Sequence, residues 1–193
     1  MSAKESLKRQ SARDRLLAAA GELFYEEGVN TVGIDRVIER AGVAKASLYS
    51  NFGSKDELIR SYIVARHEAR RDRITQWLAR YGTPREKLLG VFDLLGELIA
   101  ESNFRGCAFL RASAEARPGS STRSACDDSR AWMRSLFAEL AQSAGAANPD
   151  RLAQQLVLLY DGATVSAQMD HDPGAAVAAR AMAASLLDAA GGA

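Results

Sequence analysis

The chain of 193 residues is 47% hydrophobic and 25% charged, a globular composition that excludes the disordered and fibrous classes. Its densest apolar run, residues 156–160, is far shorter than the roughly 20 residues of a transmembrane helix, and the basic first fifteen residues lack the apolar core of a secretory signal, so we expect a cytoplasmic protein. Two cysteines, Cys107 and Cys126, are too few for a disulfide framework and match no zinc-ligand spacing, so we expect reduced thiols.

The net charge of +1 conceals an asymmetry along the chain. Residues 1–87 carry 17 Lys and Arg against 12 Asp and Glu, a net +5, whereas residues 88–193 carry 8 against 12, a net −4. A polyanionic partner would therefore bind the amino half. The basic residues of that half gather in two clusters, Lys8, Arg9, Arg13 and Arg15, and Arg66, Arg70, Arg71 and Arg73. Each cluster is equally compatible with a solvated helix face.

Four prolines, many alanines and few alternating β-branched runs predict an all-α protein with about nine helices and no strand. The first helix is predicted from the apolar face of residues 16–24 and ends at Gly28. A second helix is predicted over 34–41, where apolar residues repeat at helical spacing and Gly42 follows. A short helical segment over 45–51 comes next, and Leu48 and Phe52 can anchor it from one side.

Capping signals mark the later helices. Residues 54–57, Ser-Lys-Asp-Glu, spell a capping box that begins a long helix reaching Arg80 or Tyr81. Residues 83–86, Thr-Pro-Arg-Glu, spell a second box before a helix with an apolar face over 88–99. Four further helices are predicted over 106–115, around 132–140, after Asn148-Pro149, and from Asp172-Pro173.

Residues 31–57 carry the main functional signal. Two short helices separated by a glycine-containing turn, followed by an aromatic anchor and a capped helix, have the spacing of a helix-turn-helix. In that motif the first helix braces the second, so that the exposed side chains of the second can enter a major groove of DNA. Many helix pairs bind no DNA, so the spacing alone leaves both interpretations open.

The residues themselves resemble the amino-terminal domain of the TetR family of bacterial transcriptional regulators. The resemblance covers residues 10–66 and rests on the turn Ala41-Gly42-Val43, the pair Leu48-Tyr49, Phe52, and the segment 54–58 in the same order and spacing. It implies a helix-turn-helix DNA-binding domain over 10–66 and a helical ligand-binding and dimerisation domain over 67–193. Beyond residue 66 the support is the helix count alone.

The resemblance also implies roles for individual side chains. Tyr49 and Lys55 match the family's phosphate contacts, and a cation at a helix start lies where the helix dipole also favours an anion. Outward side chains of the recognition helix are candidates for base edges: Lys45 for guanine, Ala46 for a thymine methyl, and Asn51 for adenine. Ser47, Ser50, Arg36 and Thr31 complete the expected DNA-binding set. Without the motif, Tyr49 would be a half-buried aromatic and Lys55 a solvated first-turn lysine.

The chain departs from the family pattern at several positions. Val32 and Gly33 replace hydroxyl residues that commonly open the second helix, and Thr31 is the candidate substitute, one residue displaced. Ala44 stands where serine often caps the recognition helix, and alanine cannot accept the cap hydrogen bond. Asn51 and Gly53 replace a common histidine and proline.

The second half is expected to dimerise and to hold a small effector, as in the family. The last two helices are the usual dimer pair, and the expected interface residues, which could equally form an intramolecular core, are Leu152, Leu156, Leu159, Val177, Leu186 and Leu187. The candidate pocket residues, each of which could instead be a core residue, are His67, Trp77, Phe92, Phe109, Trp132, Met133 and Tyr160. Such a pocket would suit a hydrophobic or aromatic effector that changes the spacing of the recognition helices.

The expected partners are therefore a palindromic DNA operator, an effector and a second copy of the chain, and repression is the family's usual outcome. Two alternatives remain from the residues. An enzyme would need a catalytic constellation or a metal site, and residues 169–172 offer only His171 beside Asp170 and Asp172, where Asp172 is better explained as a cap before Pro173. We therefore expect no catalysis, no metal and no cofactor. A scaffold that binds only protein would keep the apolar faces without needing outward Lys45, Tyr49 and Lys55.

Overall fold

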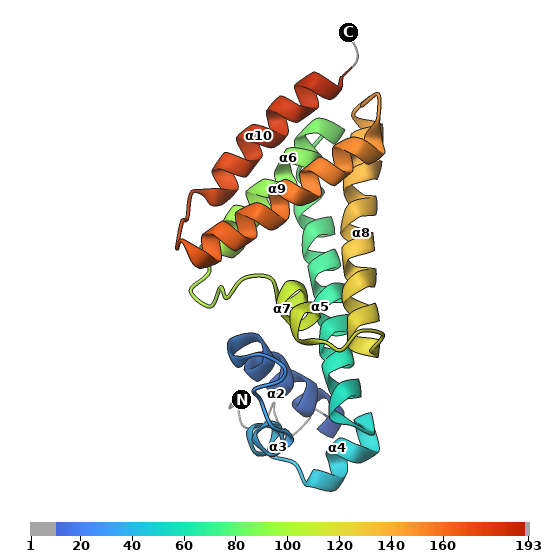
Figure 1. Ribbon diagram of the computed structural model, residues 1–193, viewed down its shortest axis with the longest axis vertical. Coiled ribbons are helices and arrows are strands. Elements are labelled where there is room, and N and C mark those ends of the chain that lie inside the picture. The colour runs from blue at the N-terminus through green and yellow to red at the C-terminus, as the bar shows by residue number, and fades with distance from the viewer. Residues whose placement is uncertain (1–10, 192–193) are drawn as a thin grey trace. The chain divides into compact units, whose positions relative to one another are not determined.

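The computed structural model describes residues 11–191, which form nine α-helices and no strand (Figure 1). The predicted all-α class is therefore confirmed. Helices are labelled as in Figure 1, beginning with α2. No helix in this part of the chain is both long enough and apolar enough to cross a membrane. Two compact units are present: unit 1 extends to His67 and also contains residues 108–127, and unit 2 contains residues 68–107 and those from 128 onward.

Unit 1 is built from four complete helices and parts of two others. The complete helices are α2 (Ala12–Glu27), α3 (Ile34–Ala41), α4 (Lys45–Phe52) and α7 (Ala108–Glu115), joined by the first part of α5 (Lys55–Leu78) and the start of α8 (Ser121–Ser143). Residues 108–127, which the sequence-based division placed with the second domain, thus belong to the compact unit that holds the helix-turn-helix.

The predicted glycine stops of α2 and α3 are confirmed. Gly28 ends α2 with φ 96°, and Gly42 ends α3 in the left-handed conformation, φ 62°. Both values lie where residues with a Cβ are strained. The helices enclose one apolar core whose fully buried members include Leu16, Val32, Val37, Leu48, Leu58 and Ile63.

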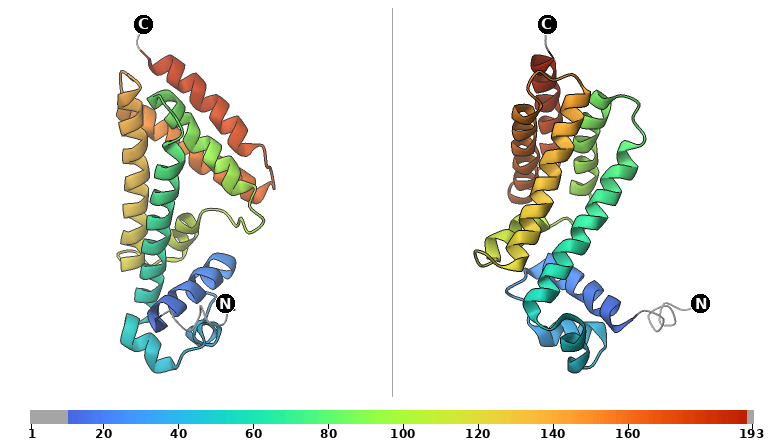
Figure 2. Two further views of the ribbon diagram at one scale, coloured as in Figure 1. Left: turned by 180° about the vertical axis from the view of Figure 1, so that it is seen from behind. Right: turned by 90° about the vertical axis from the view of Figure 1, so that its right-hand side faces the viewer.

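Unit 2 is centred on α6 (Pro84–Ile99), α9 (Pro149–Met169) and α10 (Ala175–Ala190), which pack against one another (Figures 1 and 2). The predicted capping box of α6 is complete: Thr83 Oγ1 accepts from the Glu86 N–H at 3.2 Å, and the Glu86 carboxylate accepts from the Thr83 N–H at 2.9 Å. The core contains an aromatic cluster of Phe92, Phe137 and Tyr160, with ring centroids 5.8–6.3 Å apart.

Two helix ends differ from the sequence prediction because the chain turns more tightly than an α-helix there. α5 ends at Leu78 rather than at Arg80 or Tyr81, since the N–H groups of Arg80 and Tyr81 donate to carbonyls three residues back. α7 begins at Ala108 rather than at Gly106, because Gly106 has φ 83° and lies against the Gln168 carboxamide.

Two helix starts also differ. α8 begins at Ser121, well before the apolar stripe that predicted it near Trp132, because its first turns bury small side chains such as Thr122 and Ser129. α10 begins at Ala175 rather than after Asp172, whose Oδ1 accepts from the Gly174 N–H at 2.8 Å. Asp172 therefore caps the preceding turn and not the helix.

Candidate nucleic-acid interface

The turn between α3 and α4 holds the two helices of the candidate DNA-binding motif. The Gly42 N–H donates to the Glu39 carbonyl at 3.1 Å and the Val43 N–H donates to the Ile38 carbonyl at 3.3 Å. Arg15 Nη1 donates to the Gly42 carbonyl at 3.1 Å, which ties α2 to this turn. Two of the orphan carbonyls at the end of α3 are thus satisfied, and these bonds fix the turn that leads into α4.

Two side chains anchor α4 in unit 1. Leu48 is fully buried and Phe52 is 6% exposed, as their spacing predicted. Ala44 caps the helix without a side-chain hydrogen bond, as expected for alanine. The guanidinium of Arg13 lies over the Phe52 ring, 5.3 Å from its centroid, and covers this anchor. Because α4 has only eight residues, its position depends on these contacts.

The remaining surface of α4 is turned to solvent. Lys45, Ala46, Ser50 and Asn51 are exposed, and Tyr49 is 47% exposed despite its aromatic ring. Ser47 is partly buried. An eight-residue helix therefore presents one cation, one methyl group, a phenol and short polar side chains together, which are the groups that contact phosphates and base edges.

Some of these polar groups have partners within the protein. The Ser47 carbonyl accepts from Asn51 Nδ2 at 2.7 Å and from Ser50 Oγ at 3.2 Å. The Lys45 ammonium lies 3.0 Å from Asp35 Oδ1, and this hydrogen bond raises the pKa of Lys45. Both Lys45 and Asn51 would have to leave these partners in order to contact a base.

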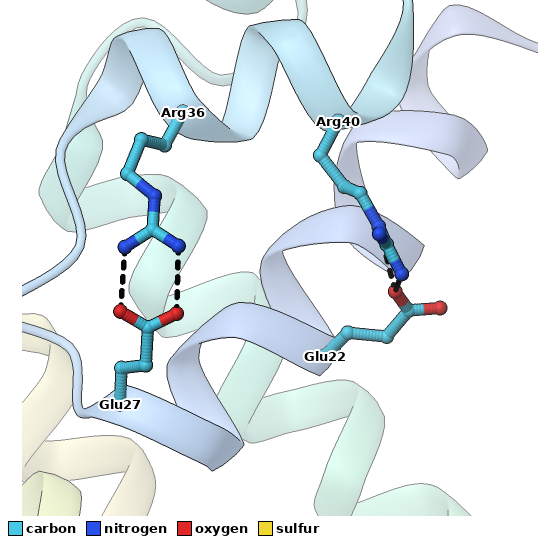
Figure 3. Close-up of polar contacts among 4 residues, drawn as sticks. All are labelled: Glu22, Glu27, Arg36 and Arg40. Atoms are coloured by element: carbon cyan, nitrogen blue, oxygen red, sulfur yellow. Dashed lines mark hydrogen bonds and ion pairs between the residues drawn. The ribbon is translucent and has the colours of Figure 1, made fainter.

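Two arginines of α3 point back to α2 (Figure 3). Arg36 donates to both carboxylate oxygens of Glu27, at 2.5 and 2.8 Å, and Arg40 bonds Glu22 Oε2 at 2.6 and 3.0 Å. Hydrogen bonding to Arg36 lowers the pKa of Glu27, and the same contact raises the pKa of Arg36. Arg36, which the resemblance placed at DNA, is thus engaged in a bidentate brace between α2 and α3 (Figure 3).

Lys55 and Thr31 lie on the segments that flank the motif. Thr31 is exposed in the turn before α3. Lys55 is the first residue of α5, and its Nζ donates to the Asn30 carbonyl at 3.4 Å. Of the predicted capping box at this helix start, the Ser54 Oγ accepts from the Glu57 N–H at 3.1 Å, while the Glu57 carboxylate pairs with Arg60 at 2.7 Å.

The described members of the basic clusters largely pair with other groups of the protein, whereas the sequence predicted either a polyanion-binding surface or a solvated helix face. Arg66 stacks over the Tyr25 ring at 4.0 Å from its centroid. In unit 2, Arg70 donates to the Ser129 carbonyl and Oγ at 2.9 and 2.6 Å, and Arg73 pairs with Glu101 at 2.6 Å. Lys8 and Arg9 of the first cluster lie outside the described residues.

The residues predicted for the effector pocket divide between the units. Phe92, Met133 and Tyr160 are buried core residues of unit 2, and Trp77 and Trp132 pack partly buried against that core. Burial raises the pKa of Tyr160 to about 12. His67 and Phe109 belong to unit 1.

Most residues predicted for the dimer interface lie in the interior of their own unit. Leu152, Leu156 and Leu187 are at most 8% exposed, and Leu159 and Leu186 pack against the same core. Only Val177 of that set is exposed, at 71%. The burial of these leucines fits the intramolecular core that the sequence left open as an alternative, because helical spacing identifies an apolar face without showing what covers it.

Sequence reasoning missed one functional candidate and one surface. Glu115, at the end of α7, accepts a hydrogen bond from the Asn30 N–H at 2.8 Å, across 85 residues of sequence, so no local pattern could reveal it. A set of exposed apolar side chains on α9 and α10 was also missed: Leu158, Met169 and Met182. Among residues 11–191, no group of three or more His, Cys, Asp or Glu side chains is arranged to hold a metal ion.

Comparison with known proteins agrees with this arrangement. The family model described as "Bacterial regulatory proteins, tetR family" matches residues 16–62. The structure is similar to that of a TetR-family transcriptional regulator from Streptomyces coelicolor, with a TM-score of 0.88, 31% identity, and coverage of 94% of this chain and 96% of that one. A putative TetR-type regulator from Streptomyces avermitilis gives a TM-score of 0.83 at 33% identity, covering 94% and 98% of the two chains.

The curated relatives are also transcriptional regulators, and they include an activator and a repressor. The transcriptional activator FasR of Mycolicibacterium smegmatis is 43% identical over 61 residues, which are 32% of this chain and 27% of FasR. The transcriptional repressor NemR of Escherichia coli is 26% identical over 168 residues, 81% of this chain and 84% of NemR. The chain spans about a quarter to a half of the length of the first curated relatives it matches.

Proposed function

This chain belongs to the TetR family of bacterial regulatory proteins, and we propose that it represses transcription as a homodimer that leaves a palindromic operator when a small ligand binds. The observation that supports this most directly is the solvent-facing side of α4, where Lys45, Ala46 and Tyr49 are exposed while Leu48 holds the helix from behind. A protein-binding scaffold has no need for this combination of exposed groups. As a regulator of genes, the protein would act in the cytoplasm, where the bacterial chromosome lies.

Tyr49 and Lys55 would contact phosphates and set the register of the protein on the duplex. Lys45, Ala46 and Asn51 would contact guanine, a thymine methyl and adenine, with Ser47, Ser50 and Thr31 close by. Lys45 would exchange the Asp35 carboxylate for DNA, so Asp35 competes with the operator for this cation. Because Arg36 is already held by both oxygens of Glu27, its proposed role is to brace α3 rather than to contact DNA.

Exposed apolar side chains on α9 and α10 support a homodimer. Leu158 is 68% exposed, Met169 74%, Val177 71% and Met182 56%, all on two helices packed side by side (Figure 2). Large apolar groups in such numbers on one helix pair favour burial against another surface. A Cβ built on Gly162 would meet no atom within 4 Å, which leaves room for a second helix to approach α9 closely. We therefore replace the buried leucines of the expected interface with these exposed residues.

A two-fold axis through this helix pair would generate two copies of α4. Dimers that read DNA in this way place their recognition helices about 34 to 36 Å apart, or a multiple of that distance, which is one turn of the duplex. The operator would then be a palindrome, because each half-site meets the same α4 side chains.

Release by a ligand completes the proposal. The aromatic rings of Phe92, Phe137 and Tyr160 give unit 2 an interior suited to a mostly apolar effector with few polar groups. Moving the ratio of the DNA-free state to the DNA-binding state from 1:99 to 99:1 requires about 5.5 kcal/mol of differential affinity. A ligand of this kind can supply that only if it binds the DNA-free state far better than the DNA-binding state. Repression is proposed because NemR, which aligns over most of this chain, carries that description.

The test is selection of binding sites from a random-sequence duplex library, followed by mobility shift at two salt concentrations with unrelated competitor DNA. Competitor-resistant binding to a palindrome by two protomers supports the proposal. Weak, steeply salt-dependent binding that competitor removes contradicts sequence-specific regulation. Small aromatic and aliphatic compounds are then added at saturation, and a complete lack of effect on affinity contradicts regulation by such a ligand.

A further inference from the structure

The end of α7 forms two hydrogen bonds with the turn between α2 and α3. Glu115 is the last residue of α7, and its Oε2 accepts from the Asn30 backbone N–H at 2.8 Å. In return, Asn30 Nδ2 donates to the Glu115 backbone carbonyl at 3.1 Å. One residue of the turn is thus held through both its peptide and its side chain by one residue of α7, and the first of these bonds is charge-assisted.

Two neighbouring contacts show that the end of α2 also packs closely against α7. Gly28 has φ 96°, and a Cβ added there would lie 2.8 Å from Glu115 Oε1, so the carboxylate fills space that only glycine leaves open. One helical turn before Glu115, Arg111 Nη1 donates to the Tyr25 carbonyl at 2.6 Å. That carbonyl is one of those at the end of α2 that have no partner within the helix.

Asn30 also contacts the proposed DNA-binding surface. The Asn30 carbonyl accepts from Lys55 Nζ at 3.4 Å, and the exposed Thr31 follows directly in the chain. The same peptide segment therefore bonds Glu115 on one side and the proposed phosphate-binding cation on the other. Unlike Lys45, whose ammonium faces the Asp35 carboxylate, Lys55 is held here by a neutral carbonyl that phosphate can displace at lower cost.

We infer that Glu115 is a positioning residue for DNA binding: it fixes the Asn30 peptide, and through the Asn30 carbonyl it holds Lys55 where a phosphate is met. This inference rests on the proposed function. It assigns to α7, which lies far along the sequence from the helix-turn-helix, a direct part in the geometry of the DNA-binding surface. The residues of this relay, Glu115, Asn30 and Lys55, all belong to unit 1.

A double-mutant cycle between Glu115 and Lys55 tests the relay. The probe is the duplex selected by the wild-type protein from a random library, and the readouts are the dissociation constant and its dependence on salt. Lys55→Ala should lower the salt slope by about 0.9 per phosphate contact, about 1.8 for a dimer. Glu115→Ala should weaken binding about tenfold, and the double variant should bind no more weakly than Lys55→Ala alone.

Conservative variants separate positioning from simple loss of structure. Glu115→Gln keeps an acceptor oxygen at the same reach and should retain most of the affinity, whereas Glu115→Asp is one carbon too short and should behave like Glu115→Ala. Glu26→Ala, at an exposed glutamate of α2 in the same unit, is the matched control and should not weaken binding. Amide hydrogen exchange over residues 12–66 verifies that unit 1 stays folded in each variant.

The outcomes are distinguishable. The relay is overturned if the losses of binding free energy caused by Glu115→Ala and Lys55→Ala add in full, or if Glu115→Asp binds like the wild type. Either result leaves the proposed function intact. A wild-type protein that selects no sequence contradicts the proposed function, and the inference falls with it.

Discussion

Replacing Leu48 and its neighbour Tyr49 with alanine should separate the anchoring of α4 from the contact that α4 makes with DNA. Leu48 is fully buried and points into the core of unit 1, whereas Tyr49, about 100° around the helix, is 47% exposed. Leu48→Ala should therefore destabilise unit 1. Tyr49→Ala should leave stability nearly unchanged and remove a phosphate contact.

The size of the first effect follows from the burial of Leu48. Leucine loses three carbons on conversion to alanine, and about 0.8 kcal/mol for each gives a transfer cost of about 2.4 kcal/mol. The cavity left in a core that cannot fully collapse brings the expected loss to about 3 to 5 kcal/mol. Tyr49→Ala, at an exposed site, should change the free energy of unfolding by less than about 0.5 kcal/mol.

The assay is amide hydrogen exchange over residues 12–66, combined with denaturation followed by circular dichroism. The tryptophan fluorescence of Trp77 and Trp132 serves as an internal control, because both residues belong to unit 2. Equal destabilisation by the two variants, or a Leu48→Ala protein that loses less than about 1 kcal/mol, would refute the assigned orientation of α4.

Three other outcomes are expected. If Arg36 is a brace, Arg36→Gln and Glu27→Gln should change operator affinity alike and leave its salt slope unaltered; a slope reduced only by Arg36→Gln would identify a phosphate contact. Since the folded pKa of Tyr160, about 12, exceeds the unfolded value near 10, its contribution to stability is present below pH 10 and is lost as the pH rises toward 12. Tyr160→Phe should reduce this loss in the free energy of unfolding by about 3 kcal/mol at most, in denaturation curves measured between pH 9 and 12. Leu158→Glu should yield monomers in analytical ultracentrifugation, while the equally drastic Leu110→Glu, at an exposed site in unit 1, should not; dimers in both would contradict the proposed interface.

Local signals in the sequence were sufficient for most of unit 1. The stops at Gly28 and Gly42 depend on the backbone angles that glycine alone adopts easily, and the anchoring by Leu48 and Phe52 depends on helical spacing. The exposure of Lys45, Tyr49 and Asn51, which lie on either side of this anchor, follows from the same spacing. These features involve residues near one another in the chain, so a pattern of residues can encode them.

Features that depend on distant partners could not be predicted in this way. Glu115 meets Asn30 across 85 residues, and Arg36 turns to Glu27 because the angle between α2 and α3 allows it. Periodicity predicted apolar faces on α9 and α10, yet it could not show that Leu152 is buried within the unit and that Leu158 is exposed. The early start of α8 was also hidden, since small residues such as Ser129 form no apolar stripe although they are buried.

Repeating the binding-site selection with Lys45→Ala shows whether α4 reads DNA sequence. We expect the wild-type protein to select a palindrome, and the variant to select the same palindrome with its preference relaxed at one symmetry-related pair of positions. Lys87→Ala, a lysine of α6 in unit 2, should select the wild-type sequence unchanged. A Lys45→Ala variant that retains every base preference, or a wild-type protein that enriches no sequence, would contradict the claim that α4 is the recognition helix.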